Sequence, residues 1–209
     1  MNREEIINYS ANSECAALII RHSIREKITD AKDSFYQLLT PEGKQYAVDF
    51  GEKLHTNRPI RLYHSIVERC KETADCIAQG YKGEVLLIEP MIDIAGFYAF
   101  QPTDILSEVN RIGVFDFISH WFKGTYPIED IQPAIQARNK MIQAIVEKSD
   151  PSYLNIFVTH DWNIILMLSL VYDIIGQKYL WPDFMDGVAL LKNQNDLICV
   201  CDTDKSIKI

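Results

Sequence analysis

The sequence predicts an α/β fold: a three-layer α/β/α sandwich with a mixed, mostly parallel sheet and a small helical cap. Short apolar runs alternate with segments of helical periodicity, as in layered α/β domains. Near the end, residues 187–191 and 197–201 flank a polar stretch and have the pattern of an antiparallel hairpin, which makes the sheet mixed. The 209 residues support one core. We therefore expect a single domain, residues 1–209, with a cap insertion at about residues 90–132.

Strand-like and helix-like segments can be placed in order along the chain. Apolar runs typical of buried strands occupy residues 16–20, 60–63, 85–88 and 154–159. Apolar residues at helical spacing occupy residues 41–54, 65–79, 135–147 and 163–175. The first half therefore reads strand, helix, strand, helix, strand, which favours a layered domain.

Residues at the expected helix ends support these boundaries. Thr40 is a good N-cap, and Pro41 suits the first helical position. Ser65 and Glu68 are three residues apart, the spacing of a capping box, and Gly80 follows that helix. We expect the last long apolar helix to stop at Gly176 in the same way.

The charge balance excludes some classes of partner. The chain has 21 basic and 29 acidic residues and a net charge of −8. Binding to nucleic acid or to an anionic membrane needs a clustered basic surface, so we expect neither partner. A small anionic substrate needs only a few local arginines. The sequence does not indicate an oligomeric state.

The N-terminal segment and the cysteines indicate a cytoplasmic protein. Residues 1–10 are polar, without the apolar core of a signal peptide. The longest apolar stretch, residues 164–172, is shorter than the roughly 18 residues of a membrane span. The five cysteines lack zinc-site spacing, and we expect most of them to be buried thiols in a reducing compartment.

The segment from about 90 to 132 is rich in aromatic residues. Eight of them lie between Ile94 and Pro127, including Phe97, Phe115 and Trp121. The segment is therefore a candidate helical cap over a substrate site. These rings are expected mainly to pack the interior of that cap.

Chemistry-bearing residues follow two of the expected strands directly. They are Arg21, His22, Arg25, His160 and Asp161. The carboxyl ends of parallel strands meet at one edge of a sheet, where open α/β proteins bind ligands. The helix after residues 60–63 carries Arg69 in its first turn. We expect the three ends to converge on a pocket of three arginines, two histidines and one acid.

Such a pocket suits phosphoryl transfer. Guanidinium groups match the charge on the three outer oxygens of a phosphoryl group. A neutral imidazole can act as the nucleophile. A carboxylic acid can protonate the leaving oxygen and later accept a proton from water. This chemistry needs no metal or cofactor, because the arginines supply the positive charge.

Three motifs together resemble the histidine phosphatase superfamily, which includes cofactor-dependent phosphoglycerate mutases and histidine acid phosphatases. They are Arg21-His22-x-x-Arg25, Ser65-x-x-x-Arg69-Cys70-x-x-Thr73-Ala74, and His160-Asp161 after a later strand. The motifs occur in family order and span residues 16 to about 175. Leu39-Thr40-x-x-Gly43 also looks like the start of the family's first helix.

The resemblance implies a function and a role for each matching residue. His22 would be the nucleophile that becomes phosphohistidine. The residues implied to bind the phosphoryl oxygens are Arg21, Arg25, Arg69 and His160. The implied reaction is hydrolysis of a phosphate monoester, which releases inorganic phosphate from a small phosphorylated substrate without a metal.

The resemblance leaves the proton donor open between two branches of the family. The pair His160-Asp161, and Arg25 three residues after His22, look like the acid-phosphatase branch, in which that aspartate is the donor. The short chain looks more like the mutase-type branch, whose donor is usually a glutamate in mid-chain. Glu89 and Asp93 are then the candidates, although the pattern around them matches poorly.

One residue departs from the family pattern. Ser23 stands where the family has a glycine directly after the nucleophilic histidine. Glycine there permits close approach of the backbone to phosphate. Ser23 is either tolerated, a phosphate ligand through its hydroxyl, or a sign of weakened catalysis. Ser23 makes one alternative function conceivable, a catalytically weak module that binds a phospho-ligand. A further alternative, independent of Ser23, is a phosphomutase of the phosphoglycerate mutase type.

Overall fold

The computed structural model describes residues 1–27, 35–193 and 196–209. The strands are β1 (Cys15–Arg21), β2 (Ile60–His64), β3 (Val85–Pro90), β4 (Leu154–Thr159), β5 (Gly187–Asn193), β6 (Asp196–Asp202) and β7 (Lys205–Lys208). The α-helices are α1 (Arg3–Tyr9), α2 (Pro41–Glu52), α3 (Glu68–Gly80), α4 (Pro102–Ile112), α5 (Val114–Phe122), α6 (Ala134–Lys148) and α7 (Asp161–Leu168). The 3₁₀ helices η2 and η3 span Ile92–Ile94 and Lys178–Leu180.

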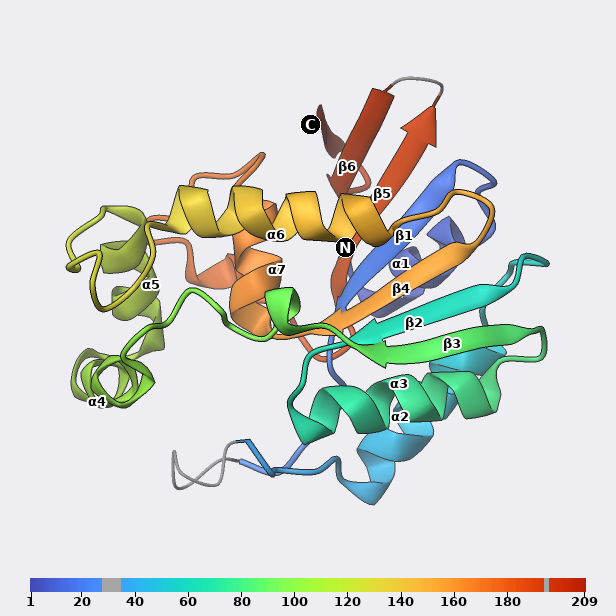
Figure 1. Ribbon diagram of the computed structural model, residues 1–209, viewed down its shortest axis with the longest axis horizontal. Coiled ribbons are helices and arrows are strands. Elements are labelled where there is room, and N and C mark those ends of the chain that lie inside the picture. Colours follow the sequence, from blue (N-terminus) through green and yellow to red (C-terminus); the bar gives the residue numbers. More distant parts are fainter. Residues whose placement is uncertain (28–34, 194–195) are drawn as a thin grey trace.

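The described strands form one mixed sheet in the order β3-β2-β4-β1-β5-β6-β7 (Figure 1). β3, β2, β4 and β1 pair in parallel, whereas β5, β6 and β7 pair with their neighbours in antiparallel fashion. The predicted mixed α/β architecture is confirmed. β5 and β6 also pair as predicted, but the turn residues 194–195 lie outside the described residues.

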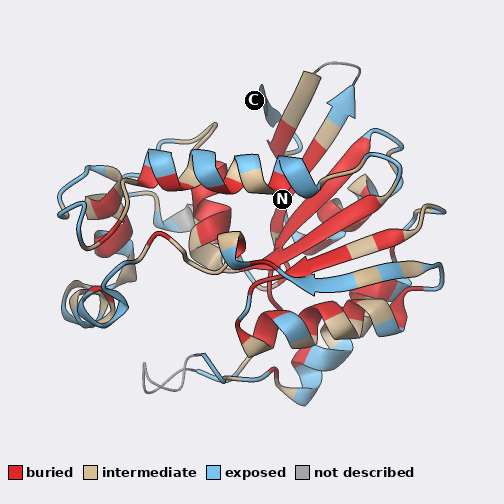
Figure 2. Cartoon of the chain, viewed as in Figure 1, coloured by how far each residue is buried: buried red, intermediate tan, exposed pale blue. Residues whose placement is uncertain are grey.

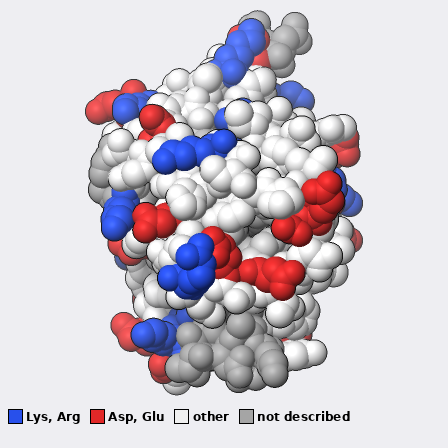
Figure 3. Space-filling view, turned by 90° about the vertical axis from the view of Figure 1, so that its left-hand side faces the viewer, with Lys and Arg blue, Asp and Glu red and all other residues white. Residues whose placement is uncertain are grey.

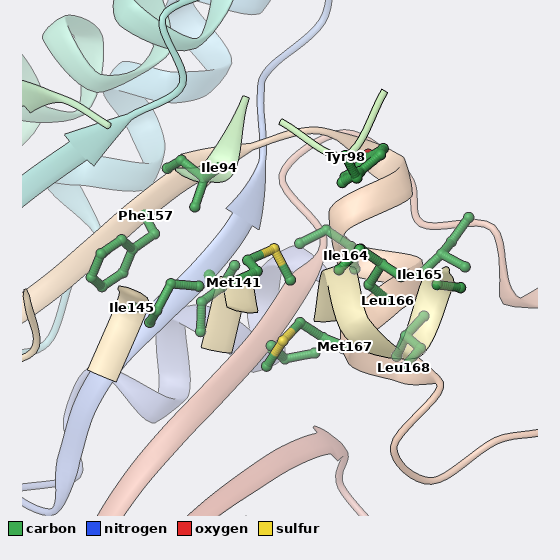
Figure 4. Packing of buried hydrophobic residues seen from close by; sticks show 14 of the residues in the cluster. Ile94, Tyr98, Met141, Ile145, Phe157, Ile164, Ile165, Leu166, Met167 and Leu168 are labelled. Carbon is green, nitrogen blue, oxygen red and sulfur yellow. The ribbon is translucent and has the colours of Figure 1, made fainter. Parts of the chain in front are cut away.

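Helices cover both faces of the sheet, which makes three layers (Figure 1). Alternate residues of β1 point to opposite faces: Leu18 and Ile20 pack in the core shared with α2 and α3, whereas Ile19 packs in the core shared with α6 and α7. Figure 2 shows the central strands as the buried middle of the molecule. Figure 4 shows Met141 of α6 and Ile164 of α7 in the second of these cores.

Close approach of two helices fixes the position of α3 on the sheet. A Cβ atom on Gly80 would lie 2.0 Å from the carbonyl oxygen of Val48, and one on Gly51 would lie 2.2 Å from that of Ile77. The absence of side chains at these two positions therefore lets α2 and α3 touch backbone to backbone. Both contacts lie at the C-terminal end of α3 and in the second half of α2.

The segment between β3 and α6 contains η2, α4 and α5. In Figure 1 α4 and α5 lie on the side toward which β2 and β3 point. Several of its aromatic rings are buried, Tyr98, Phe117 and Trp121 among them, as expected for rings that pack an interior. Residues Ala99 and Ile131 form an antiparallel bridge that closes the segment.

Some local predictions were wrong. The apolar run at 85–88 is an edge strand rather than a buried one, because β3 has a neighbour on one side only: Leu86 is 40% and Ile88 36% exposed (Figure 2). Ser65 does not cap α3, which begins at Glu68 after Val67. The helix expected to reach residue 175 ends at Leu168, where hydrogen bonds three residues apart tighten the chain into turns. β7 was not predicted.

The cysteines and the helices agree with two further expectations. Four of the five cysteines are buried, and each of the five has a free thiol. Among the residues that the structure describes, no helix has the length and apolar character needed to cross a membrane.

Candidate active site

Parallel pairing of β1 with β4 brings the two histidines together. Arg21 pairs with Thr159 in the register of these strands, so the next residue of each strand is a histidine at the same edge. The backbone N–H of His22 donates to the carbonyl of Thr159 at 2.8 Å. The imidazole rings of His22 and His160 lie edge to face with their centroids 5.7 Å apart.

Arg69 joins the two histidines from the first turn of α3. Its Nε–H donates to Nε2 of His22 at 3.0 Å, and its guanidinium nitrogen lies 3.3 Å from Nδ1 of His160. Arg69 is buried. The structure therefore brings together three of the residues that the sequence singled out, one from each of the elements β1, α3 and β4.

The environment of His22 suits a nucleophile. Its Nδ1–H donates to the carbonyl of Ser23 at 2.8 Å, which places the lone pair on Nε2, the atom that faces Arg69. Burial, followed by the charge of Arg69 and the neighbouring His160, lowers the pKa of His22 well below its ordinary value of 6.5. The ring is therefore neutral at physiological pH, with its lone pair directed into the site.

His160 lies in a similar environment and contacts Ser65, the residue that the sequence predicted to cap a helix. Burial, then the charges of Arg69, Arg21 and Arg25, lower the pKa of His160 well below its ordinary value. The hydroxyl of Ser65 lies 2.8 Å from Nε2 of His160. Ser65 therefore orients this ring instead of capping α3.

Arg21 and Asp161 form an ion pair at the edge of the site. The guanidinium of Arg21 lies 3.0 Å from one Asp161 oxygen, and the other Asp161 oxygen accepts from the backbone N–H of Trp162. Arg21 also donates to the carbonyl of Pro182 at 2.7 Å. Its Nε is buried and has no partner among the described residues.

Arg25, in the loop after β1, is the third arginine that the sequence assigned to the site. Its guanidinium donates to the carbonyl of Glu26, and its buried Nε has no partner among the described residues. Burial and, after it, the nearby charge of Arg69 lower the pKa of Arg25, because the two guanidinium groups repel each other. An anion bound between them would relieve that repulsion.

Figure 3 shows the face of the molecule at which α4 and α5 lie in Figure 1. On the face shown there, acidic and basic side chains are interspersed among uncharged ones rather than gathered into a basic patch. Within the described residues, no group of three or more His, Cys, Asp or Glu side chains has the arrangement of a metal site.

Ser23 is directed into the fold. It is completely buried, its hydroxyl donates to the carbonyl of Gly43 at 2.7 Å, and its N–H donates to Thr73 at 3.0 Å. The hydroxyl is thus engaged by the start of α2 and does not face the arginines. This position explains how a serine is accommodated beside the nucleophile.

The two mid-chain acids differ in position. Glu89 is exposed on the edge strand β3, and β2 and β4 lie between β3 and β1. Asp93 lies on η2, whose last residue, Ile94, accepts hydrogen bonds from Thr159 and Asn163. Of the two, Asp93 is therefore held near the end of β4, and Glu89 is not brought to the histidines.

Several residues support the site through contacts that the sequence did not predict. Ser65 holds His160, and Thr73 joins Ser23 to the carbonyl of Arg69. Pro182 and Phe184 contact Arg21 from a loop more than 150 residues away in the chain, with the Arg21 guanidinium 4.3 Å from the Phe184 ring centre. The spacing of the family motifs suggested Ser65 and Thr73, but nothing marked Phe184.

Comparisons with known proteins agree with this geometry. A family model described as the histidine phosphatase superfamily (branch 1) matches residues 19–171. No curated protein matches the chain significantly.

Solved structures share the fold at low identity. Bacillus stearothermophilus YhfR has a TM-score of 0.58 and 17% identity, with 87% of this chain and 93% of that chain covered. A putative α-ribazole-5′-P phosphatase from Escherichia coli has a TM-score of 0.55 and 18% identity, with 85% and 91% covered. A phosphoserine phosphatase mutant from Entamoeba histolytica, in complex with phosphoserine, has a TM-score of 0.54 and 14% identity, with 92% and 93% covered.

We predict that His22 stays neutral at pH values below 6.5, as the Nδ1–H tautomer, because burial and Arg69 lower its pKa. The unfolded chain binds protons at its histidines near the ordinary pKa, so the free energy of unfolding should fall as the pH drops through 6.5. Nitrogen and carbon NMR shifts of the ring across pH measure both the charge and the tautomer. The denatured chain is the control, and a His22 signal that titrates as it does in the denatured chain contradicts the prediction.

We predict that Ser23→Ala lowers the free energy of unfolding by about 1 kcal/mol, because it removes the buried hydrogen bond to Gly43. Ser23→Gly should cost about 2 kcal/mol, since the glycine also adds freedom to the unfolded chain. Chemical denaturation measures both, with the exposed Ser107→Ala as the matched control. Stability equal to that of the wild type in Ser23→Gly would show that the serine is not a structural part of the fold.

Proposed function

Since the chain belongs to the histidine phosphatase superfamily, we propose that it is a metal-independent phosphate monoester hydrolase that acts through a covalent phosphohistidine. The observation that carries the proposal is the hydrogen bond from Arg69 to the unprotonated Nε2 of a buried, neutral His22. In this pair the neutral imidazole supplies the nucleophile, and the fixed guanidinium binds the phosphoryl group that the imidazole attacks.

In the first step, Nε2 of His22 attacks phosphorus in line with the leaving oxygen. The new N–P bond forms as the P–O bond to the organic group breaks, and the transferred phosphoryl group stays in the site. Arg21, Arg25 and Arg69 hold its oxygens and neutralise the charge that develops on them. In the second step, water attacks the phosphohistidine and inorganic phosphate leaves.

His160 is the second imidazole proposed to hold the phosphoryl group. Because Arg69 can only donate, Nδ1 of His160 accepts from its guanidinium, and Nε2–H donates to the hydroxyl of Ser65. A phosphoryl oxygen that takes the place of the Ser65 hydroxyl would receive the hydrogen bond from Nε2–H beside those from the arginines.

Asp161 is the proposed proton donor to the leaving alcohol and the base that activates water in the second step. It begins α7 directly after His160, at the edge of the site that Arg21 occupies. Its ion pair with Arg21 has to loosen for it to serve as an acid, and an anion that draws Arg21 toward itself would do this. Asp93 on η2 and Glu89 on β3 are the acids against which this assignment is tested.

The substrate class proposed is a small phosphorylated organic molecule, handled in the cytoplasm. Structural relatives are named for phosphoserine, α-ribazole-5′-P and glucosyl-3-phosphoglycerate, the last from a mycobacterial phosphatase with a TM-score of 0.51, 14% identity, and 83% of this chain and 88% of that chain covered. We further propose that residues 90–132 act as the cap that selects the organic group. Their position beyond the ends of β2 and β3 supports this assignment (Figure 1).

We predict that rapid quenching with a ³²P-labelled aryl phosphate traps acid-labile, base-stable label on the wild type and none on His22→Ala. Label of this stability indicates a phosphorus–nitrogen bond, and the variant removes only the side chain of His22. His55→Ala is the matched control and should label as the wild type does. Label that persists in His22→Ala overturns the assignment of the nucleophile.

The fate of the label separates the alternatives. Release as inorganic phosphate supports a hydrolase. Transfer to a substrate hydroxyl, with dependence on a bisphosphorylated primer, identifies a phosphomutase. Phosphate binding without label or turnover across a broad substrate panel identifies a binding module.

We predict that Asp161→Asn slows phosphoenzyme formation from an alkyl phosphate about 100-fold, the scale of lost general acid catalysis. The effect with 4-nitrophenyl phosphate should be far smaller, because its leaving group needs no proton. Single-turnover rates with both substrates measure this difference. Glu89→Gln is the matched control, and the same leaving-group dependence in Asp93→Asn instead of Asp161→Asn transfers the role to η2.

A further inference from the structure

The loop between η3 and β5 contacts Arg21 at three points. The carbonyl of Pro182 accepts from the guanidinium at 2.7 Å, and the carbonyl of Asp186 accepts from the backbone N–H of Arg21 at 2.9 Å. Between them, the ring of Phe184 stacks under the guanidinium, with Cζ 4.3 Å from the ring centre. One loop therefore positions the backbone of Arg21 and both the edge and the face of its guanidinium.

The same ring also contacts the nucleophile. The centroids of Phe184 and His22 lie 5.7 Å apart, and His22 is only 2% exposed. Phe184 is itself half-buried, so one part of it faces the protein and another faces solvent. The ring of Phe184 thus covers part of His22, stacks on the Arg21 guanidinium and remains partly open to solvent.

We propose that Phe184 is a positioning residue of the reaction: its ring fixes the plane of the Arg21 guanidinium for the phosphoryl oxygens and keeps water from His22. This inference rests on the proposed function. It adds a residue from a loop that no motif of the sequence marked.

The hydrogen bonds of Arg21 show why its plane matters. One terminal nitrogen is used by Pro182 and the other by Asp161, which leaves the buried Nε–H without a partner among the described residues. A guanidinium presents its donors in its own plane. The stacked ring sets that plane, and hence the direction in which the unpartnered Nε–H points.

The shielding of His22 has its own consequence. The charged and titratable groups that face His22 are Arg69 from α3, His160 after β4, and Arg21, which is paired with Asp161. Burial is the largest cause of the lowered pKa of His22, and Phe184 provides part of that burial. Removing the ring should therefore raise the pKa of His22 toward its ordinary value, and activity should be lost at a higher pH on the acid side.

Two substitutions separate the two effects. Phe184→Leu keeps apolar bulk over His22 but removes the π face under Arg21. It should weaken the affinity for inorganic phosphate about fivefold, the scale of one lost cation–π contact, and leave the acid limb of the kcat/KM profile in place. Phe184→Ala should weaken phosphate binding and also move the acid limb to higher pH. Phe184→Tyr keeps the ring and should retain the wild-type phosphate affinity.

The experiment measures phosphate affinity by calorimetry and the pH profile of kcat/KM with 4-nitrophenyl phosphate. Thermal melting of each variant checks the fold. Tyr153→Leu is the matched control: Tyr153 is also a half-buried ring under a guanidinium, with Cζ of Arg61 3.8 Å from its centre, and it lies at the opposite end of β4 from His160. It should leave both readouts unchanged.

Each outcome decides the inference. Wild-type phosphate affinity in Phe184→Leu, or equal losses in Phe184→Leu and Tyr153→Leu, overturns it. An inactive wild type that binds phosphate refutes the proposed function, while the phosphate affinities of the variants still decide the role of Phe184. A wild type that neither turns over substrate nor binds phosphate refutes both.

Discussion

The parallel pairing of β1 with β4 is the constraint on which the site depends. The register places Arg21 opposite Thr159, so each chain leaves the sheet with a histidine at the same level. A shift of one residue would turn every side chain of β1 to the other face and separate the two rings. The apolar residues of β1 hold this register, because alternate residues pack in two different cores and the shift would move each of them into the other core. The geometry of the histidines is thus a consequence of core packing rather than of any contact between them.

The site concentrates positive charge around two neutral rings. Burial, and after it the charges of Arg69 and Arg21, lower the pKa values of His22 and His160, and burial followed by Arg69 lowers that of Arg25. These groups repel one another in the folded protein, and their repulsion is maintained by the helices and strands to which they are attached. A phosphoryl group with charge on three oxygens converts that repulsion into attraction. The same arrangement that costs stability in the folded protein therefore favours the charged group during transfer.

Local signals in the sequence predicted much of the fold and the centre of the site. Apolar runs marked β1, β2 and β4, the Thr40-Pro41 pair marked the start of α2, and the residues after the strands marked both histidines. These features are local, since each depends on neighbours in the chain. The apolar pattern of β3 could not show that this strand is at the edge, because the edge is defined by the absence of another strand. Ser65 was assigned to a cap by its spacing, but its hydroxyl is taken by His160, a residue that is distant in the chain.

The contribution of Phe184 shows why the site could not be completed from motifs alone. β5 runs antiparallel to β1, so its first residue, Gly187, pairs with Ile20 at the edge where the parallel strands end. The loop that enters β5 is for that reason delivered to the same edge as the histidines. Gly187 lacks a Cβ, which would lie 2.0 Å from the carbonyl of Ile19, and this close approach holds the loop against β1. The antiparallel half of the sheet thus supports a site whose principal residues come from the parallel half, and the mixed topology is what joins them.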